Sequence, residues 1–597
     1  MKKAIFCVLA ICVLAACTKN ILDKEDKTGL GAETWDNEST ATLYLNRCYA
    51  VIMPNWPANA GTSTLPYAIH NTNDESNTVG STAILFGTLA TDGVTDFGTV
   101  SGNGALAYVN IRKVNILLNE IDKGTLPESV RTKIKAEAYF LRAWNYFNLV
   151  KLYGGVPYLT KPQDWIEDNV YIPRNKTSEC IDSIIRDLDM AALAERTNIA
   201  AQTSGNRGRI TRGAAMAMKG RVLLYWASAQ FNPNNDMARW EAAYQANKKA
   251  YDSLLIDGHA LHASFANVLL DESAANRELI MIRSYDGVIN SNSFENAARP
   301  SSEGGGGGYQ PTWDLVQAFP MKSGLPITDP ASGYDPVYYW KNRDPRFDAT
   351  IVYNGAIWGL STQPTRRQWT YAGTPNNPEA TVSTTGFYTR KGVNTATARV
   401  NAANGTTDWV EIRLAEVMLN LAEAANATGR STEAYDMLTK LRQRAGITAG
   451  TGNLYGLKSG MSNAEMFTAI MNERRIELAF EGKRYDDLRR TKLWTSLNGT
   501  FRRKLTLTVK SPHTTTTLNN FIPGSTTVRV RDTINVDGPS YTNFFTATIT
   551  NIDAATSPIN FKPEYYYYAI PSTHLGRNPQ LLQTKGWATA NFFEPLQ

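Results

Sequence analysis

Few residues in this sequence have the types and spacing that metal or nucleotide chemistry requires. The five histidines are scattered, and His259 and His262 lack the i,i+4 spacing and the glutamate of a zinc-binding helix. Leu457 separates Gly456 from Lys458, which excludes a phosphate-binding loop there, and no Gly-x-Ser-x-Gly elbow is present. We therefore expect no cofactor and no catalytic metal. A structural calcium ion leaves no readable spacing outside motifs such as the EF-hand, so calcium binding stays open.

Residues 472–490 contain several carboxylates, and glycoside hydrolysis requires a pair of carboxylates. Arginines alternate with these acids at i+3 and i+4. We interpret the segment as a helix that ion pairs connect to its neighbours, and a hydrolytic carboxylate pair is the alternative. The acids are Glu473, Glu477, Glu481, Asp486 and Asp487, and the arginines are Arg474, Arg475, Arg484, Arg489 and Arg490.

The most specific chemical signal is a cysteine near the start of the chain. Lys2 and Lys3 precede an apolar run over residues 4–16, which is shorter than the roughly 20 residues that a membrane-spanning helix needs. The run ends in Leu-Ala-Ala before Cys17, and polar sequence follows at once. This pattern resembles a bacterial lipobox, and it predicts cleavage before Cys17 and lipidation of its sulfur.

The composition is that of a folded chain with no strong charge. Of the 597 residues, 43% are hydrophobic and 19% are charged, and the net charge is +6. No dense block of Lys and Arg occurs, so we expect no nucleic-acid partner. Cys48 and Cys180 are the two cysteines after Cys17. We expect both to be free and buried, although a single disulfide between them would also be possible.

Apolar periodicity predicts helices over much of the chain. Residues 41–53, 108–121 and 128–152 form separate helical segments, and the last carries apolar residues on two faces. A helix packed on two sides belongs to a stacked array. We further predict helical hairpins like tetratricopeptide repeats at residues 211–253 and 413–444, where small residues alternate with large ones.

The remaining sequence predicts long loops and a few short strands. Residues 287–407 are rich in Gly, Asn, Pro and Thr. Apolar and polar residues alternate over residues 505–510, 527–531 and 546–550, which predicts strands. The fold class is therefore mainly α, with irregular loops.

Several of these stretches together resemble the SusD/RagB family of outer-membrane nutrient-uptake lipoproteins. The resemblance extends from residue 17 to residue 587 and is weakest in loops and in residues 500–555. Its blocks are the lipobox at Cys17, residues 110–115 and 136–157, residues 219–227, residues 340–347, residues 412–426, residues 472–490, and residues 565–579 with Gln583 and Trp587.

The resemblance implies a fold and a function. It implies a SusD-like α-helical body with tetratricopeptide-like units, carried by a lipid anchor on the outer face of the outer membrane. The protein would act as a lid on a SusC-like TonB-dependent transporter and pass captured glycans to it, without being an enzyme. We divide the chain into a signal peptide (1–16), a lipidated tether (17–40), an N-terminal helical region (41–260) and a C-terminal region with loops, helices and strands (261–597).

Glycan capture requires aromatic rings that stack on sugar rings and polar groups that bind hydroxyls. The irregular segments supply such residues, although each aromatic residue could instead pack in the core. The ligand-binding candidates are Phe97, Asn103, Tyr309, Trp313, Trp358 and Trp369.

Three other functions stay open. A member of the same family could bind peptides, a surface glycoside hydrolase could bind and cut its ligand, and a repeat scaffold could bind only the transporter. The sequence does not identify the glycan, its length or its linkage.

Overall fold

The computed structural model describes residues 31–56, 72–77, 82–93, 107–164, 166–193, 206–373, 379 and 381–596. Cys17 and the predicted signal peptide lie outside these residues. The same is true of Phe97 and Asn103. Lipidation of Cys17 and the ligand contacts of Phe97 and Asn103 therefore stay predictions.

Long α-helices are the main regular elements of the described residues, as the apolar periodicity predicts. The helices predicted from the sequence are confirmed to within a few residues, except the single helix predicted over residues 472–490. Helix α7 was not predicted. In the described part of the chain, no helix is long and apolar enough to cross a membrane. The long helices are α2 (Glu38–Ile52), α5 (Ala107–Glu120), α6 (Glu128–Tyr153), α7 (Thr177–Ala191), α8 (Arg212–Ala227), α9 (Met237–Ile256), α13 (Leu414–Ala427), α14 (Ser431–Ala445) and α15 (Asn463–Glu477).

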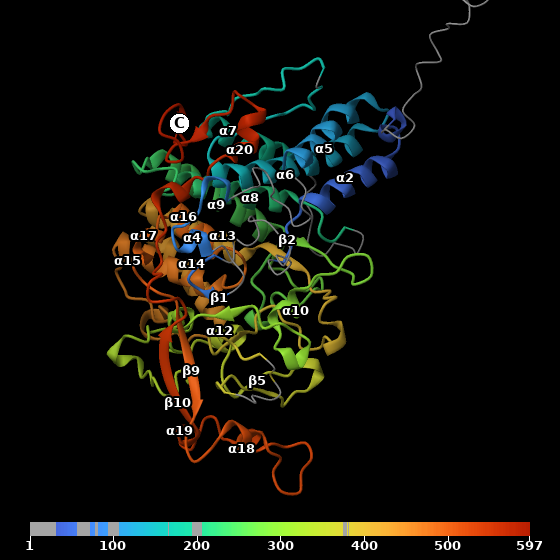
Figure 1. Cartoon of the computed structure of the whole chain (residues 1–597). Coiled ribbons are helices and arrows are strands. Elements are labelled where there is room, and N and C mark those ends of the chain that lie inside the picture. The colour runs from blue at the N-terminus through green and yellow to red at the C-terminus, as the bar shows by residue number, and fades with distance from the viewer. Residues whose placement is uncertain are drawn as a thin grey trace, which may run out of the picture.

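These helices stack side by side in a continuous array (Figure 1). Helix α6 packs against α2, α5 and α7, and α8 lies between α7 and α9. Helix α13 then packs on α9 and α8, although more than 150 residues separate it from α9 in the sequence. The hairpins α8–α9 and α13–α14 are the two predicted from the sequence, and one hydrophobic core runs through the N-terminal and C-terminal regions.

Close helix packing follows from small residues, as at the crossing of α8 and α9. A Cβ atom added to Gly220 would lie 2.4 Å from Asn247 Oδ1. The Asn247 amide donates to the Gly220 carbonyl (3.0 Å), which fixes the two helices at this short separation. The C-terminal half of α6 is buried on all sides, which confirms a helix packed on two faces.

The short helices within residues 294–350 and 515–544 lie, with turns, below the array in the view of Figure 1. They surround a second core that is rich in aromatic side chains. The short helices are α4 (Thr82–Leu85), α10 (Phe294–Ala298), α11 (Trp313–Ala318), α12 (Pro345–Thr350), α16 (Arg484–Arg490), α17 (Trp494–Leu497), α18 (Thr515–Asn519), α19 (Tyr541–Phe544) and α20 (Ser572–Arg577).

The strands of the described residues form two-stranded ribbons and no larger sheet. Pairs β1–β3, β2–β8, β4–β7, β5–β6 and β9–β10 are antiparallel, and β11–β12 is parallel. The strands are β1 (Ser76–Asn77), β2 (Leu279–Arg283), β3 (Gln310–Pro311), β4 (Ile351–Val352), β5 (Ala356–Ile357), β6 (Arg367–Gln368), β7 (Tyr388–Thr389), β8 (Trp409–Arg413), β9 (Arg503–Val509), β10 (Phe545–Asn551), β11 (Gln583–Thr584) and β12 (Phe592–Phe593).

The longest ribbon, β9–β10, confirms two of the predicted strands. Phe545 pairs with Val509 and Asn551 with Arg503 across seven registered positions. The third predicted strand, at residues 527–531, is wrong: the chain there forms a 3-10 turn from Val530, and Arg529 makes only an isolated bridge. Alternation alone does not make a strand where no partner strand lies beside it.

The single helix predicted over residues 472–490 is also wrong, because the chain breaks between α15 and α16. Phe480 and Gly482 adopt left-handed backbone angles, with φ of 61° and 71°. A left-handed residue ends an α-helix, so the charged segment becomes two separate helices.

The two remaining cysteines are free and buried, as expected from the sequence. Burial raises the pKa of each thiol to about 12. Both thiols therefore stay protonated near neutral pH and behave as small apolar side chains.

Candidate functional site

The aromatic candidates that the structure describes lie in the second core and present no surface for stacking. Tyr309 is 6% exposed, Trp313 3%, Trp358 0% and Trp369 2%. Because a stacked sugar needs an open ring face, these four residues cannot form a glycan platform in this conformation. The structure therefore places these four rings in the core, which is the alternative that the sequence left open for each of them.

Contacts on all sides explain this burial. Trp313 packs edge-on against Tyr339 at 5.1 Å between ring centroids, and Trp369 Nε1 donates to Asp532 at 3.1 Å. Large rings in loops remove more apolar area from water when they pack on one another than when they lie open.

The carboxylates of the charged segment are also inaccessible, which confirms the ion-pair interpretation. Arg346 Nη1 lies 2.6 Å from Glu473 Oε1 and 2.9 Å from Glu477 Oε2. Arg413 reaches Glu477 and Glu481 at 2.7 Å each. Burial alone would raise the pKa of Glu477, but the surrounding arginines hold it well below its usual range. A sugar cannot reach these groups, so they are no hydrolytic pair.

An open cleft lies where helix α2 meets the turn at residues 206–209, strand β2 and the loop at residues 284–290. Its larger part has a volume of about 560 Å³, and a smaller part of about 250 Å³ lies on the other side of the turn. The size of the larger part falls within the roughly 300–1,000 Å³ of typical ligand sites. We call the two parts together the arginine cleft, because Arg207 and Arg209 line both of them.

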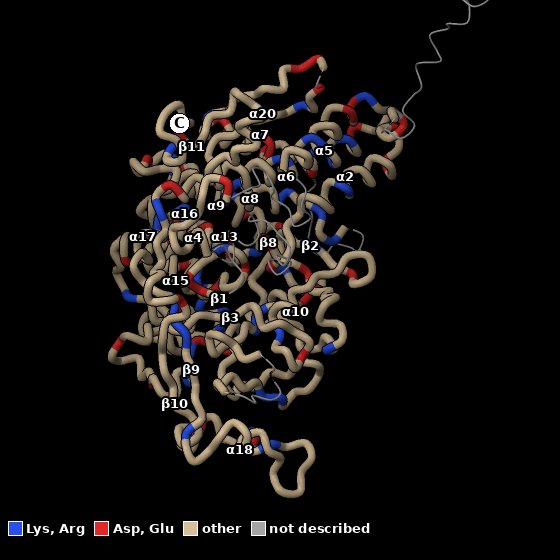
Figure 2. Tube along the Cα trace, viewed as in Figure 1, with Lys and Arg blue, Asp and Glu red and all other residues tan. Residues whose placement is uncertain are grey.

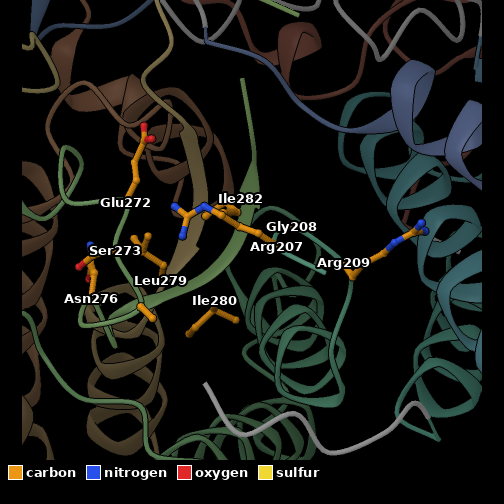
Figure 3. A pocket seen from close by; sticks show the side chains of 10 residues that line it. Arg207, Gly208, Arg209, Glu272, Ser273, Asn276, Leu279, Ile280 and Ile282 are labelled. Carbon is orange, nitrogen blue, oxygen red and sulfur yellow. The ribbon is translucent and has the colours of Figure 1, made fainter. Parts of the chain in front are cut away.

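The turn at residues 206–209 lies between the two parts of the cleft, and its two arginine side chains point in opposite directions. Figure 3 shows Arg207 and Arg209 leaving the turn on opposite sides. Arg207 donates through Nε and Nη2 to Asp408 Oδ2, at 3.0 and 2.8 Å. Asp408 directly precedes β8, so this pair fixes the turn to the β2–β8 ribbon.

Arg209 fixes the other side of the turn to the helical array. It donates to Glu137 Oε2 of α6 at 3.2 Å and to Asn46 Oδ1 of α2. Tyr49 Oη also donates to Glu137, at 2.5 Å, and accepts from the Ile210 amide at 3.0 Å. Burial raises the pKa of Glu137, and the hydrogen bonds from Tyr49 and Arg209 oppose this rise.

A tight loop forms the outer wall of the cleft. Asp286 Oδ1 accepts from the backbone amides of Val288, Ile289 and Asn290, each at 2.9 Å. This loop holds Val288 and Ile289 in water, at 90% and 93% exposed. Two aliphatic side chains at the rim offer an apolar surface beside the polar lining.

The lining of the arginine cleft suits binding better than catalysis. Among the described residues that line its two parts, Glu272 is the one acidic side chain. Asn46, Tyr49, Ser284 and Asn290 add hydrogen-bonding groups to the larger part. A glycoside hydrolase needs two carboxylates flanking the scissile bond, and this lining does not offer them.

Sequence reasoning did not find this cleft. Arg47, the turn arginines and Arg283 come from three separate segments of the chain, with 236 positions between Arg47 and Arg283, and none stands in a recognisable motif. The one local signal is the Arg-Gly-Arg of the turn, which by itself is too short to indicate a site.

Comparison with known proteins decides the family. A model described as the SusD family matches residues 277–587, which is more than half of the chain. The chain belongs to the SusD family. A second model of SusD-like proteins, described as starch-binding and associating with the outer membrane, matches residues 88–224. The resemblance read from the sequence is thereby confirmed.

Relatives of this SusD-family protein share its fold over nearly the whole chain. SusD-like protein P2 of Formosa agariphila is 26% identical over 407 residues, which are 68% of this chain and 74% of the relative. A solved SusD-like carbohydrate-binding protein from Bacteroides fragilis is 22% identical, covers 92% of this chain and 99% of its own, and has a TM-score of 0.69. A laminarin-binding SusD-like protein is 19% identical, covers 92% and 98%, and has a TM-score of 0.54.

Proposed function

We propose that this SusD-family protein is a cell-surface lipoprotein that captures glycans and delivers them to a SusC-like TonB-dependent transporter in the outer membrane. The match of the SusD family model over residues 277–587 carries the proposal. The description of the second matching model, starch-binding and associating with the outer membrane, supports both the ligand class and the location.

The lipobox supports the anchor. Acylation of Cys17 would tether the body to the outer membrane, since each buried CH₂ of an acyl chain contributes about 0.8 kcal/mol. The body would then face the extracellular side, where it meets polysaccharide before the transporter does. A lid on the barrel would have to close over a captured glycan and swing away to admit the next.

Binding rather than cutting is the role that the arginine cleft supports. Its lining combines hydrogen-bonding groups with the exposed aliphatic side chain of Ile289, which Val288 precedes in the loop. Glycan capture needs reversible contacts of this kind and no acid–base pair.

Binding of glycans by the mature body, residues 18–597, tests the proposal directly. Calorimetry or affinity gels would compare plant, host and microbial polysaccharides with a peptide mixture, and product analysis would follow each glycan. Saturable binding to one glycan class without product release is the expected result. Binding of peptides alone, or release of shorter sugars, would overturn it in favour of a peptide-binding or a hydrolytic protein.

The anchor and the transporter need a separate test in cells. Replacing Cys17→Ala should move the protein from the outer-membrane fraction to a soluble fraction. Purification of the wild-type protein from membranes should bring a TonB-dependent barrel with it. Absence of any barrel from such preparations would contradict the delivery step.

A further inference from the structure

We propose that the arginine cleft is a glycan subsite selective for negatively charged sugars, which carry uronate carboxylates or sulfate esters. This inference rests on the proposed function and goes further by naming the class of ligand. Both substituents offer the same chemistry, an oxyanion that accepts several N–H donors.

The charge of the larger part of the cleft is the first argument. Arg47, Arg207, Arg209 and Arg283 line it, and none of the lining residues that the structure describes is acidic. Glu272 lines only the smaller part, on the far side of the turn. A ligand in the larger part therefore meets positive charge on several sides.

Two of these arginines keep charges that no carboxylate neutralises. Arg283 donates through Nη1 to the Met53 carbonyl at 2.9 Å, which caps the end of α2 but supplies no negative charge. Arg47 is exposed on α2. Within the part of the chain that the structure describes, neither Arg47 nor Arg283 forms an ion pair. An anion in the cleft would supply the missing counter-charge.

The other two arginines are held rigidly with donors to spare. Arg207 uses Nε and Nη2 on Asp408, and its Nη1 is not needed for that pair. Arg209 uses Nη1 and Nη2 on Glu137 and Asn46, which leaves Nε. Because a guanidinium has five N–H donors in a fixed plane, a side chain fixed from behind can still bind an oxyanion in front.

The acidic residues Asp286, Glu137 and Asp408 lie near the larger part of the cleft but do not line it. Asp286 turns its Oδ1 toward three backbone amides of its own loop. Glu137 and Asp408 lie behind the arginines that they bind, and both are buried. The aliphatic rim at Ile289 would contact the C–H face of the sugar ring whose charged group faces the arginines.

The test measures binding of the mature body to three groups of glycans at low and high salt. One group carries uronates, such as polygalacturonate and alginate, one carries sulfate esters, such as chondroitin sulfate and dextran sulfate, and one is neutral, such as laminarin and starch. Saturable binding of one charged group, weakened by raising salt, is the expected result. The group that binds distinguishes carboxylate from sulfate recognition.

Variants of Arg47 locate the binding, because this side chain is exposed and forms no hydrogen bond or ion pair with the residues that the structure describes. Arg47→Gln should weaken the affinity for the charged glycan about three-fold, and Arg47→Glu about ten-fold. The matched control is Arg186→Gln, an exposed arginine on helix α7 outside the cleft, which should leave affinity unchanged. Thermal unfolding of each variant checks that the fold is intact.

The outcomes separate this inference from the proposed function. Neutral glycans that bind equally well to wild type and Arg47→Glu would overturn charge selection and leave glycan capture standing. Charged glycans that bind unchanged to Arg47→Glu and to Arg283→Gln would overturn the location. No binding to any glycan would overturn both.

Discussion

Trp358 illustrates how burial decides the role of a single residue. Its side chain is 0% exposed and packs near Tyr388 in the second core, with 6.3 Å between ring centroids. An indole in such a place stabilises the fold through the apolar area that it removes from water, and it has no face left for a ligand.

We predict that Trp358→Ala lowers the free energy of unfolding by about 3–5 kcal/mol, because it leaves a large cavity. Denaturant unfolding measures this loss, and Trp358→Phe should show a smaller one. Glycan affinity of the folded variant should match that of wild type. A variant of normal stability that no longer binds glycan would return Trp358 to the list of ligand contacts.

Glu75 is a buried carboxyl that makes its environment sensitive to pH. Its Oε1 accepts from the Phe480 amide at 3.3 Å, while Oε2 has no hydrogen-bond partner among the described residues. Burial raises the pKa of Glu75 to about 7, with Arg484 opposing the rise and Asp74 adding to it.

This pKa predicts that Glu75 destabilises the protein as pH rises. The folded state holds the proton more tightly than the unfolded state, whose pKa is about 4.3. The contribution of Glu75 is therefore complete below about pH 4.3 and is lost as pH rises through 7. Glu75→Gln should be more stable than wild type by on the order of 3–4 kcal/mol at pH 8, and the difference should shrink toward pH 4. Urea unfolding across this range measures it, and a constant difference would contradict the assignment.

At the scale of elements, the α8–α9 hairpin depends on one residue without a side chain. Gly220 lets the Asn247 amide reach its carbonyl, and Asn247 also donates to the Ala243 carbonyl of its own helix at 2.8 Å. Alanine is favoured over glycine in an isolated helix by about 1 kcal/mol. Helix propensity therefore does not account for Gly220, whereas the close packing of the two helices does.

We predict that Gly220→Ala destabilises the protein by about 1–3 kcal/mol in spite of the better helix propensity, since the added methyl group meets Asn247. Thermal or denaturant unfolding measures the change. The same substitution should cost less in an Asn247→Ala background, where the colliding amide is absent. Equal costs in both backgrounds would show that the contact is not the cause.

At the scale of the whole molecule, buried ion pairs connect segments that are distant in sequence. Arg413, at the junction of β8 and α13, contacts Glu278 before β2 at 2.6 Å, and Glu477 of α15 and Glu481 beyond it. Charged residues of both signs are distributed through the molecule instead of forming one block (Figure 2). Arg413 is therefore one of the side chains that connect the helical array with the β2–β8 ribbon beside the arginine cleft.

Arg413→Met should lower the free energy of unfolding by about 3–5 kcal/mol, because three buried carboxylates lose their shared partner. Chemical denaturation measures the loss. The exposed pair of Lys440 with Asp436, at 2.7 Å, is the matched control, and Lys440→Met should change stability by less than about 1 kcal/mol. Similar losses in both variants would contradict a special role for the buried network.

Features that neighbouring residues encode could be predicted from the sequence. The apolar spacing of residues 128–152 predicts α6, and the small residues of the 211–253 segment predict the α8–α9 hairpin, because helical periodicity and close packing are local patterns. The order of short blocks along the chain likewise indicates the family, and Cys17 predicts a lipid anchor.

Tertiary packing determines which distant residues contact one another. It buried Trp358 and Trp369, divided the charged segment at Phe480 and Gly482, and brought Arg47 and Arg283 beside the turn of Arg207 and Arg209. Spacing along the chain does not specify exposure or long-range neighbours, because both depend on how distant elements pack. Most of the long helices were therefore predictable from local patterns, whereas the break at Phe480 and the arginine cleft were not.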